Sequence, residues 1–535
     1  MAATIDEIKE SFLEFDVEIN DDEILEKFLF LSTLFGMDAE SLTNEWIAFQ
    51  SRNNHCDVTI HQLTLLEREI TNVRAKTRKS VKLETPVKQE IKMEYCDVIK
   101  NDSLNNNDSL LEEKVKPSQI YSSRTNSGEV VDCFCSGESP GEGVWRGGRG
   151  RVKVTWEGRK KGKYMFQRMQ ESCDVNNDHI EIGGSLIMEE NKEIESYAPC
   201  GGNSQTPVVI MGRVRSEDGA KLTPHSVALE GDRGVSSGRV GVVGVEGLTE
   251  FSLFPGKLVA MRGVNIDGRK FHVSKIFNLP RRVGRMRVGD GSKEDHFTIM
   301  VASGPFTTSD SDDHKPLLDF LDVVTKMQPS LTIFIGPLVE KATSGKTYAD
   351  SAKFWTSHII NTISDITEVV FVPSQRDLFH HPVYPQPPYN IPGSTKVHFV
   401  SNPATIIVND KIKIGVSSTD ILFHLVATEI SRSATKKSDR IGRLVSHILN
   451  QGSFYPLYPP DKSVNLDLLS SEDHGRIPPD VDLVLLPSNL QHFIKDVAGH
   501  ICINPGRIVK GKSGGTYARI LVDEDRSCVA EIIKI

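Results

Sequence analysis

Three side chains that could bind a catalytic metal stand close together in one short stretch of the sequence. Residues 371–389, "FVPSQRDLFHHPVYPQPPY", hold Asp377, His380 and His381 just behind an apolar run that is typical of the end of a buried strand. Hydrolytic metal centres use carboxylate and imidazole ligands, because the metal lowers the pKa of a bound water molecule towards neutrality. Whether such a centre exists depends on the ligands that the rest of the chain supplies.

A second stretch matches a phosphate-binding pattern, but its surroundings argue against a nucleotide site. Residues 506–513, "GRIVKGKS", fit the pattern G-x-x-x-x-G-K-[ST], in which backbone N–H groups surround a phosphate at the start of a helix. Two glycines and a strand-like run follow in place of that helix. A near match at residues 340–347 has Glu340 where the first glycine should be, so a carboxylate would face the phosphates. We therefore expect no bound nucleotide.

The composition predicts a folded protein without a nucleic-acid coat or a membrane span. The chain has 535 residues, 38% of them hydrophobic, and a formal charge of −9. That length suits about three to four domains, and the negative charge argues against bulk nucleic-acid binding. The eight cysteines include no C-x-x-C pair, and no apolar run approaches the ~18 residues that span a bilayer. We expect reduced thiols, no cofactor, and a soluble intracellular chain.

Residues 1–72 are predicted to form a small acidic helical domain. Thr4 and Glu7 have the spacing of a capping box, and "DDEILEKFLFLSTLFG" repeats the helical period up to Gly36. Two further helices would bury Trp46 and Leu66 with their neighbours. An acidic bundle of this kind favours a protein-docking module over a site of chemistry.

Residues 73–190 are predicted to be largely flexible linker, because charged and polar stretches replace the helical period. A basic cluster at residues 74–82 is either a nuclear import signal or a solvated tether. Thr85 precedes Pro86 in a pattern that cell-cycle kinases favour, so it is a candidate phosphorylation site. Residues 144–169 alternate basic and aromatic side chains, which fits either a segment that stacks on nucleic acid or a glycine-rich connector.

Two further domains are predicted from the strand patterns. Residues 195–285 hold short alternating strands separated by glycines, which indicates an OB-type β-barrel. Its aromatic residues are sparse, so packing against a partner is favoured over binding of a single strand. Residues 295–535 alternate strands and helices, and the strands near residues 369–372 and 483–486 are continuously apolar, as in a sheet covered on both faces.

The strand ends of this α/β region resemble those of calcineurin-like phosphoesterases, which hold two metal ions on D-x-H, G-D, G-N-H-[DE] and G-H-x-H motifs. At the corresponding places the chain has "SGP", "GP", "SQRD" and "PSNL". One carboxylate cannot hold two divalent ions, and His380 and His381 are expected to be loop residues. The resemblance implies an inactivated phosphoesterase fold without catalytic or metal residues, whose former metal positions are Ser303, Pro305, Pro337, Gln375, Arg376 and Asp377. Arg376 is expected to pair with Asp377.

Longer strings resemble the B subunits of eukaryotic replicative DNA polymerases, and specifically that of DNA polymerase alpha-primase. They include "YSSRTNSGEVV" at 121, "EFSLFPGKLV" at 250, "SSTDILFHL" at 417, "SFYPLYPP" at 453 and "INPGRIVKGKSGGTYARI" at 503. The resemblance implies a nuclear, non-catalytic subunit that binds the C-terminal region of the polymerase catalytic subunit and links it to primase for starting new strands. Contact with DNA would be weak or indirect.

Two loops dense in tyrosine and proline are candidates for the partner-facing surface. Tyr384 and Tyr389 lie in one loop, and Tyr455 and Tyr458 lie in the other. Stiff amphipathic loops suit a preorganised interface, although they could equally cover the domain's own core. Two other functions stay open, a single-stranded nucleic-acid-binding module and an active metallo-phosphodiesterase.

Overall fold

The computed structural model describes residues 3–13, 17, 19, 21–52, 58–79, 118–136, 142–145, 152–160, 162–217, 219–289, 296–341, 347–391, 394–433, 439–523 and 525–535. The chain divides into two compact units, one formed by most of residues 1–116 and one formed by Pro117–Ile535. Thr85 lies outside the described residues, so its phosphorylation stays a prediction. None of the described helices is long and apolar enough to cross a bilayer.

The described part of the N-terminal unit consists of the helices α1 (Ile5–Leu13), α2 (Asp22–Phe35), α3 (Ala39–Arg52) and α4 (Ile60–Lys79). The predicted capping box is present, since the Thr4 amide donates to the Glu7 carboxylate over 2.9 Å and the Glu7 amide donates to Thr4 Oγ1 over 3.3 Å. At the centre of the unit, buried Phe28 contacts both Phe12 and Trp46, which are also buried. The predicted helices are confirmed.

The larger unit contains a closed barrel with the strand order β3-β4-β5-β8-β7. Its strands are β3 (Ser204–Ser216), β4 (Val227–Glu230), β5 (Val240–Gly244), β7 (Leu258–Asn265) and β8 (Lys270–Asn278). The helix α7 (Met169–Glu190) lies against β3 and β7, and its Ile180 and Ile187 share an apolar cluster with Met211 and Phe277 of the barrel. The predicted OB barrel is confirmed, with this helix as an added part.

The α/β region is built on two mixed sheets. The larger sheet has the order β1-β23-β22-β10-β11-β12-β13, with β9 paired to β23, and the smaller has the order β18-β19-β17-β15-β14-β2. Strands β10 to β13 run parallel, so their carboxyl ends meet at one edge. The larger sheet comprises β1 (Val130–Phe134), β9 (Arg287–Val288), β10 (His296–Ser303), β11 (Leu331–Ile335), β12 (Glu368–Val372), β13 (Val397–Phe399), β22 (Thr516–Asp523) and β23 (Ser527–Lys534). The smaller comprises β2 (Val154–Gly158), β14 (Ala404–Val408), β15 (Ile412–Val416), β17 (Leu483–Leu485), β18 (Phe493–Val497) and β19 (His500–Asn504).

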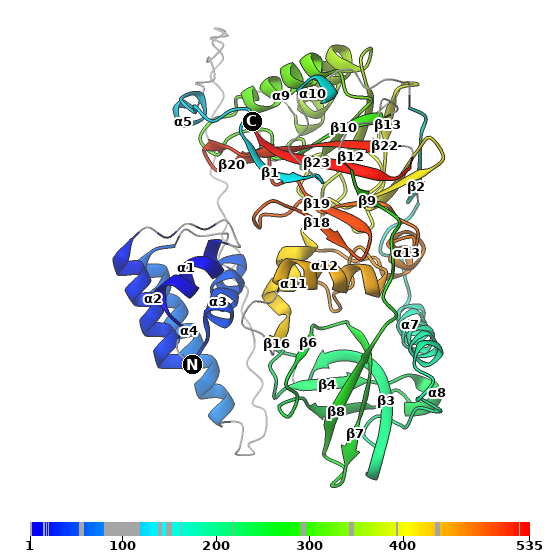
Figure 1. The fold of residues 1–535 in the computed structure, drawn as a ribbon. Coiled ribbons are helices and arrows are strands. Elements are labelled where there is room, and N and C mark those ends of the chain that lie inside the picture. Colours follow the sequence, from blue (N-terminus) through cyan, green and yellow to red (C-terminus); the bar gives the residue numbers. More distant parts are fainter. Residues whose placement is uncertain are drawn as a thin grey trace, which may run out of the picture. The chain divides into compact units, whose positions relative to one another are not determined.

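The two sheets face each other across one apolar core, to which Ile299 and Ile333 of the larger sheet and Ile414 and Leu483 of the smaller sheet belong. Helices cover the outer faces (Figure 1). On the larger sheet these helices are α9 (Lys315–Met327) and α10 (Tyr348–Ile363), and on the smaller sheet they are α11 (Ile421–Thr428) and α12 (Arg440–Gln451). The predicted layered α/β arrangement is confirmed.

The expectation that residues 73–190 are largely flexible linker is wrong from about residue 118 onward. Besides α7, the described residues there form α5 (Gln119–Ser122), α6 (Glu142–Trp145) and the strands β1 and β2. Strand β1 pairs with β23, and β2 pairs with β14, so their hydrogen-bond partners lie hundreds of residues further along the chain. A short strand with a distant partner carries little periodicity of its own.

Candidate functional site

The predicted strand-end positions lie where expected, at the edge where the parallel strands end. Ser303 is the last residue of β10, Pro337 follows β11, and Asp377 follows β12. All three are buried, whereas Pro305 and Gln375 are half-buried and Arg376 is exposed. We call these loops, together with the ends of β17 and β19, the strand-end edge.

Asp377 ties two loops of this edge together. Its Oδ1 accepts from the amides of Leu338 (2.5 Å) and Val339 (3.2 Å), and its Oδ2 accepts from the Ser374 amide (2.9 Å) and from the Tyr389 hydroxyl. Burial raises the pKa of this carboxyl to about 6, although the four donors favour its charged form. The carboxylate that matched a metal ligand in the sequence therefore has its oxygens occupied by the protein.

The expected pairing of Arg376 with Asp377 is wrong. Arg376 points away from the edge and forms an ion pair with Glu340, to which its Nε donates over 2.9 Å. Residues 374–377 form a turn that the hydrogen bond from the Asp377 amide to the Ser374 carbonyl closes over 3.0 Å. Within this turn Asp377 is buried and Arg376 is exposed.

A buried guanidinium occupies the edge beside Ser303. Arg507 Nη1 donates to Ser303 Oγ over 2.9 Å, its Nε donates to Asn489 Oδ1 over 3.2 Å, and its Nη2 lies 3.6 Å from Asp420 Oδ2. Burial lowers its pKa to about 10, so it is charged at neutral pH. Asp420 also accepts from Ser488 Oγ (2.5 Å) and from the Asn489 amide (2.7 Å). The loops after β10, β15, β17 and β19 thus share one charged network.

This charged network argues against the binding of a divalent metal ion at the strand-end edge. A fixed cation in a low-dielectric site repels a divalent metal ion, and its one nearby carboxylate is already paired with it. Within the described residues, no group of three or more His, Cys, Asp or Glu side chains is placed to hold a metal ion. Arg507 belongs to the string that matched the phosphate-binding pattern, but β20 (Val509–Lys510) and β21 (Ser513–Gly514) form a hairpin there, as expected from the missing helix.

Three of the four tyrosines proposed to face a partner are inside the fold. Tyr384, Tyr389 and Tyr455 are at most 4% exposed, which favours the alternative that these loops cover the domain's own core. Tyr384 and Tyr455 touch each other, with ring centroids 5.5 Å apart. Tyr458 is half-buried, and its hydroxyl accepts from Asn176 Nδ2 over 3.1 Å. The two proline-rich loops therefore cover the domain's own core.

The aromatic residues of the basic stretch 144–169 are mostly packed into the fold as well. Trp145 is buried under the guanidinium of Arg519, which lies 4.4 Å from its ring. Trp156 is partly buried in β2, opposite Ile406 of β14. Phe166 remains exposed. A row of stacking platforms for nucleic acid is therefore not found among the described residues of this stretch.

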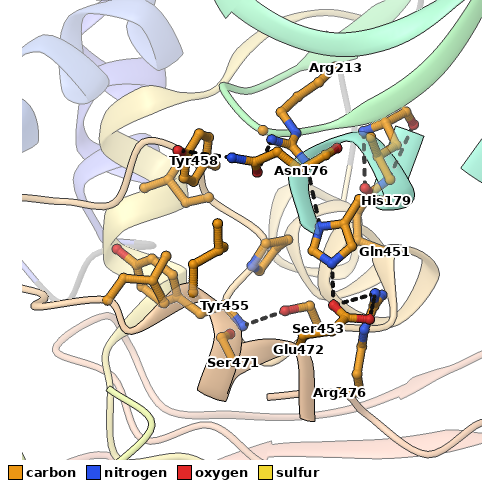
Figure 2. Close-up of a pocket in the computed structure, with 16 residues that line it drawn as sticks. Asn176, His179, Arg213, Gln451, Ser453, Tyr455, Tyr458, Ser471, Glu472 and Arg476 are labelled. Carbon is orange, nitrogen blue, oxygen red and sulfur yellow. Dashed lines mark hydrogen bonds and ion pairs between the residues drawn. The ribbon is translucent and has the colours of Figure 1, made fainter. Parts of the chain in front are cut away.

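A small hollow with polar and apolar walls lies between the barrel and the α/β region (Figure 2). His179 of α7 contacts Arg213 of β3 through Nδ1 (3.4 Å) and Glu472 of α13 (Leu468–His474) through Nε2. Glu472 also accepts from Arg476 over 2.7 Å, and these partners lower its pKa to about 2 although burial opposes that. The hollow measures about 60 Å³, which is room for roughly two water molecules. The side chains around it connect the barrel and its helix α7 to the α/β region, and the hollow is too small to be a ligand pocket.

A second contact between the barrel and the α/β region resembles a catalytic triad in composition but not in geometry. The strand β6 (Phe251–Leu253) pairs with β16 (Ile430–Arg432), and beside them Ser252 Oγ lies 2.6 Å from His447 Nε2. The same Nε2 contacts Glu429 over 3.3 Å, whereas a triad requires the carboxylate on the opposite ring nitrogen. Burial lowers the pKa of His447 to about 4. These groups hold the barrel against the α/β region.

Family models match most of the described architecture. The model for the N-terminal domain of the DNA polymerase alpha B subunit matches residues 6–72, and the model for the OB domain of that subunit matches residues 173–279. A third model, for the B subunits of DNA polymerases alpha and epsilon, matches residues 299–495. The OB-domain match begins inside α7, in agreement with the packing of that helix on the barrel.

Curated relatives agree with these matches. The DNA polymerase alpha B subunit of Mus musculus is 38% identical over 425 residues, which cover 76% of this chain and 70% of the mouse protein. The protein of that name from Schizosaccharomyces pombe is 28% identical over 67% of both chains, and that from Saccharomyces cerevisiae is 25% identical over 70% of this chain and 62% of its own. The chain therefore belongs to the family of DNA polymerase alpha B subunits, the accessory rather than the catalytic subunits of a polymerase of DNA replication.

Proposed function

We propose that the chain is a non-catalytic scaffold of the nuclear DNA polymerase alpha-primase complex. It binds the C-terminal region of the polymerase catalytic subunit and thereby links that subunit to primase for the start of new strands. The observation that carries this proposal is the strand-end edge, where Arg507 and its hydrogen-bond partners fill the place that a hydrolytic centre would use.

The α/β region is proposed to be a calcineurin-like phosphoesterase fold that has lost its metal centre. Support comes from the order of its elements and from Ser303, Pro337 and Asp377 at the ends of β10, β11 and β12. Metal-dependent hydrolysis needs a metal-bound water at such an edge, and a buried arginine opposes the charge of that metal. Phosphodiester hydrolysis that requires added Mn²⁺ and disappears in Asp377→Ala, while this variant remains folded, would contradict the loss of the centre.

The binding unit is proposed to begin at residue 117 rather than at 195, because β1, β2 and α7 are parts of the two sheets and of the barrel surroundings. A fragment of residues 117–535 should co-purify with the C-terminal region of the catalytic subunit. A fragment of residues 195–535 lacks these elements and should be poorly folded by circular dichroism. If residues 1–79 alone capture that region and a folded 117–535 fragment does not, the proposal is wrong.

Direct DNA binding is proposed to be weak. The barrel is the feature that favours a single-strand-binding function, but in the preceding stretch Trp145 is buried and Trp156 is partly buried. Binding of the full chain to a labelled oligonucleotide should be weak and should fall steeply with salt. Tight binding that depends on barrel side chains would favour the alternative function. Phosphorylation at Thr85 is a further proposal, which mass spectrometry of the protein from dividing cells tests.

A further inference from the structure

A groove of about 510 Å³ lies beside α10 on the surface of the larger unit. We call it the α10 groove, and its lining includes Tyr164, Ala349, Lys353, Phe379, His381 and Pro388. Its volume is in the range of typical ligand pockets, about 300–1,000 Å³. The outward-facing side chains of the loop 379–391 line the groove, whereas Asp377 and Tyr389 of the strand-end edge point inward and are buried.

The walls of the groove are held by contacts within the chain. His380 Nε2 donates to the carbonyl of Pro387 over 2.7 Å, which fixes the loop across its base. The Tyr164 ring lies 5.3 Å from the ring of His381 and 4.5 Å from the guanidinium of Arg159. Arg159 in turn donates to the carbonyl of Pro385 over 2.8 Å. A preformed groove loses less conformational entropy when it binds a partner.

Exposed aromatic side chains are neighbours of the lining residues in the sequence. Phe166 is 77% exposed, Phe354 is 51% exposed and Tyr348 is 40% exposed, and each stands within two residues of a side chain that lines the groove. Within the described part of the larger unit, these are the phenylalanines and tyrosines that are exposed. Exposed aromatic side chains beside groove-lining residues in the chain are candidates for contacts with a partner.

The charge of the groove selects the chemistry of its partner. Lys353 is exposed and has no hydrogen bond or ion pair with the described residues, and none of the described residues that line the groove carries a carboxylate. Asp350, one turn earlier on α10, accepts from Thr347 at the helix cap. An incoming carboxylate would therefore meet an unpaired cation beside an apolar wall.

We propose that the α10 groove binds an extended acidic peptide segment of a partner protein. Its apolar side chains would lie between α10 and the loop 379–391, and its carboxylates would face Lys353. A peptide is favoured over nucleic acid because the described lining holds one lysine and no arginine, and phosphate backbones are bound by several such cations. The proposal does not depend on the contact with the catalytic subunit.

Selection of random twelve-residue peptides displayed on phage, with the full chain as bait, tests this proposal. Enriched peptides should combine Asp or Glu with Phe, Trp or Leu. As labelled synthetic peptides, they should bind Lys353→Glu about tenfold more weakly in fluorescence anisotropy. Lys326→Glu on α9 is the matched control, because Lys326 is also an exposed helical lysine but does not line the groove. Ala349→Trp, at an exposed position of the wall, should block binding by filling the groove.

Three results would overturn the proposal. The first is a selection that enriches no acidic peptides, or peptides whose affinity is the same for Lys353→Glu, Ala349→Trp and the wild type. The second is binding of a twenty-nucleotide oligothymidylate that Lys353→Glu weakens, since the groove would then be a nucleic-acid site. The third is peptide binding only after deletion of the acidic stretch 94–113, since this chain would then occupy its own groove. Unchanged thermal unfolding of the variants establishes that they fold.

Discussion

The loop between β12 and β13 contributes to two regions that differ in how their polar groups are satisfied. On its inward side, Asp377 accepts four hydrogen bonds and Tyr389 donates one of them. On its outward side, Phe379, His381 and Pro388 line an open groove beside Lys353, which has no hydrogen-bond or ion-pair partner among the described residues. A polar group that is fully satisfied within the chain holds the fold, whereas exposed apolar and charged groups without partners indicate a binding surface.

This difference explains the sequence stretch 371–389, which combines a structural carboxylate with residues of a binding surface. The residues that suggested metal chemistry, Asp377, His380 and His381, do not act together. Asp377 is a structural carboxylate, and the two histidines belong to the walls of the groove. The strand-end edge should therefore respond to mutation through stability, and the α10 groove should respond through binding.

The largest expected effect is on the strand-end edge. Arg507→Met should lower the free energy of unfolding by about 3–5 kcal/mol, because it leaves the carboxylate of Asp420 without its buried partner. Lys353→Met in the groove should change it by less than about 0.5 kcal/mol. Urea unfolding of the 117–535 fragment measures both. Similar small losses in both variants would remove the distinction between the two regions.

A double variant sharpens this test. Arg507→Met combined with Asp420→Asn removes both charges, and asparagine can still cap α11, where Asp420 accepts from the Phe423 amide over 3.2 Å. The double variant should therefore be more stable than Arg507→Met alone. A further loss instead would indicate that the ion pair is not the main contribution of Arg507.

The next largest effect is a pH dependence of the unfolding free energy that the titration of Asp377 causes. Burial raises its pKa to about 6, so the folded state binds a proton more tightly than the unfolded state does. This contribution to stability is present below the unfolded pKa and is lost as the pH rises through about 6. Relative to Asp377→Asn, the wild type should lose up to about 3 kcal/mol between pH 4 and pH 7. Comparing the two proteins cancels the buried histidines, and a difference that grows in the opposite direction would contradict the raised pKa.

The sequence located the strand ends but not the side chains that meet there. Ser303, Pro337 and Asp377 follow apolar runs that end in turns, which is a local signal. Arg507 donates a hydrogen bond to Ser303 although the two residues are 204 positions apart in the sequence, and no local pattern predicts such a contact. A search for charged residues after every predicted strand would have selected Arg507 and Asp420 as candidates, but not their pairing.

The buried tyrosines and the missed strands have related causes. Loops rich in proline usually lie at the surface, so the sequence left open whether Tyr384 and Tyr455 face a partner or cover the core, and in the structure the two rings pack against each other. Strands β1 and β2 obtain their hydrogen bonds from β23 and β14 at the far end of the chain. The barrel and the helical unit were predictable because their periodic patterns lie within short segments.

The smallest expected effect is that of a single hydroxyl. Tyr389→Phe should cost about 1–2 kcal/mol of unfolding free energy at pH 8, because it removes one donor from a charged and buried carboxylate. That hydrogen bond lowers the pKa of Asp377, so its removal should raise this pKa further and make the loss smaller at pH 5, where the carboxyl is more protonated. Tyr348→Phe, at an exposed position of α10, is the control and should change stability at neither pH. If Tyr389→Phe lowers the unfolding free energy equally at both pH values, the hydroxyl contributes by packing or by a neutral hydrogen bond. Asp377 would then not be a charged acceptor, and the charge would not distinguish the inner side of this loop from the outer side.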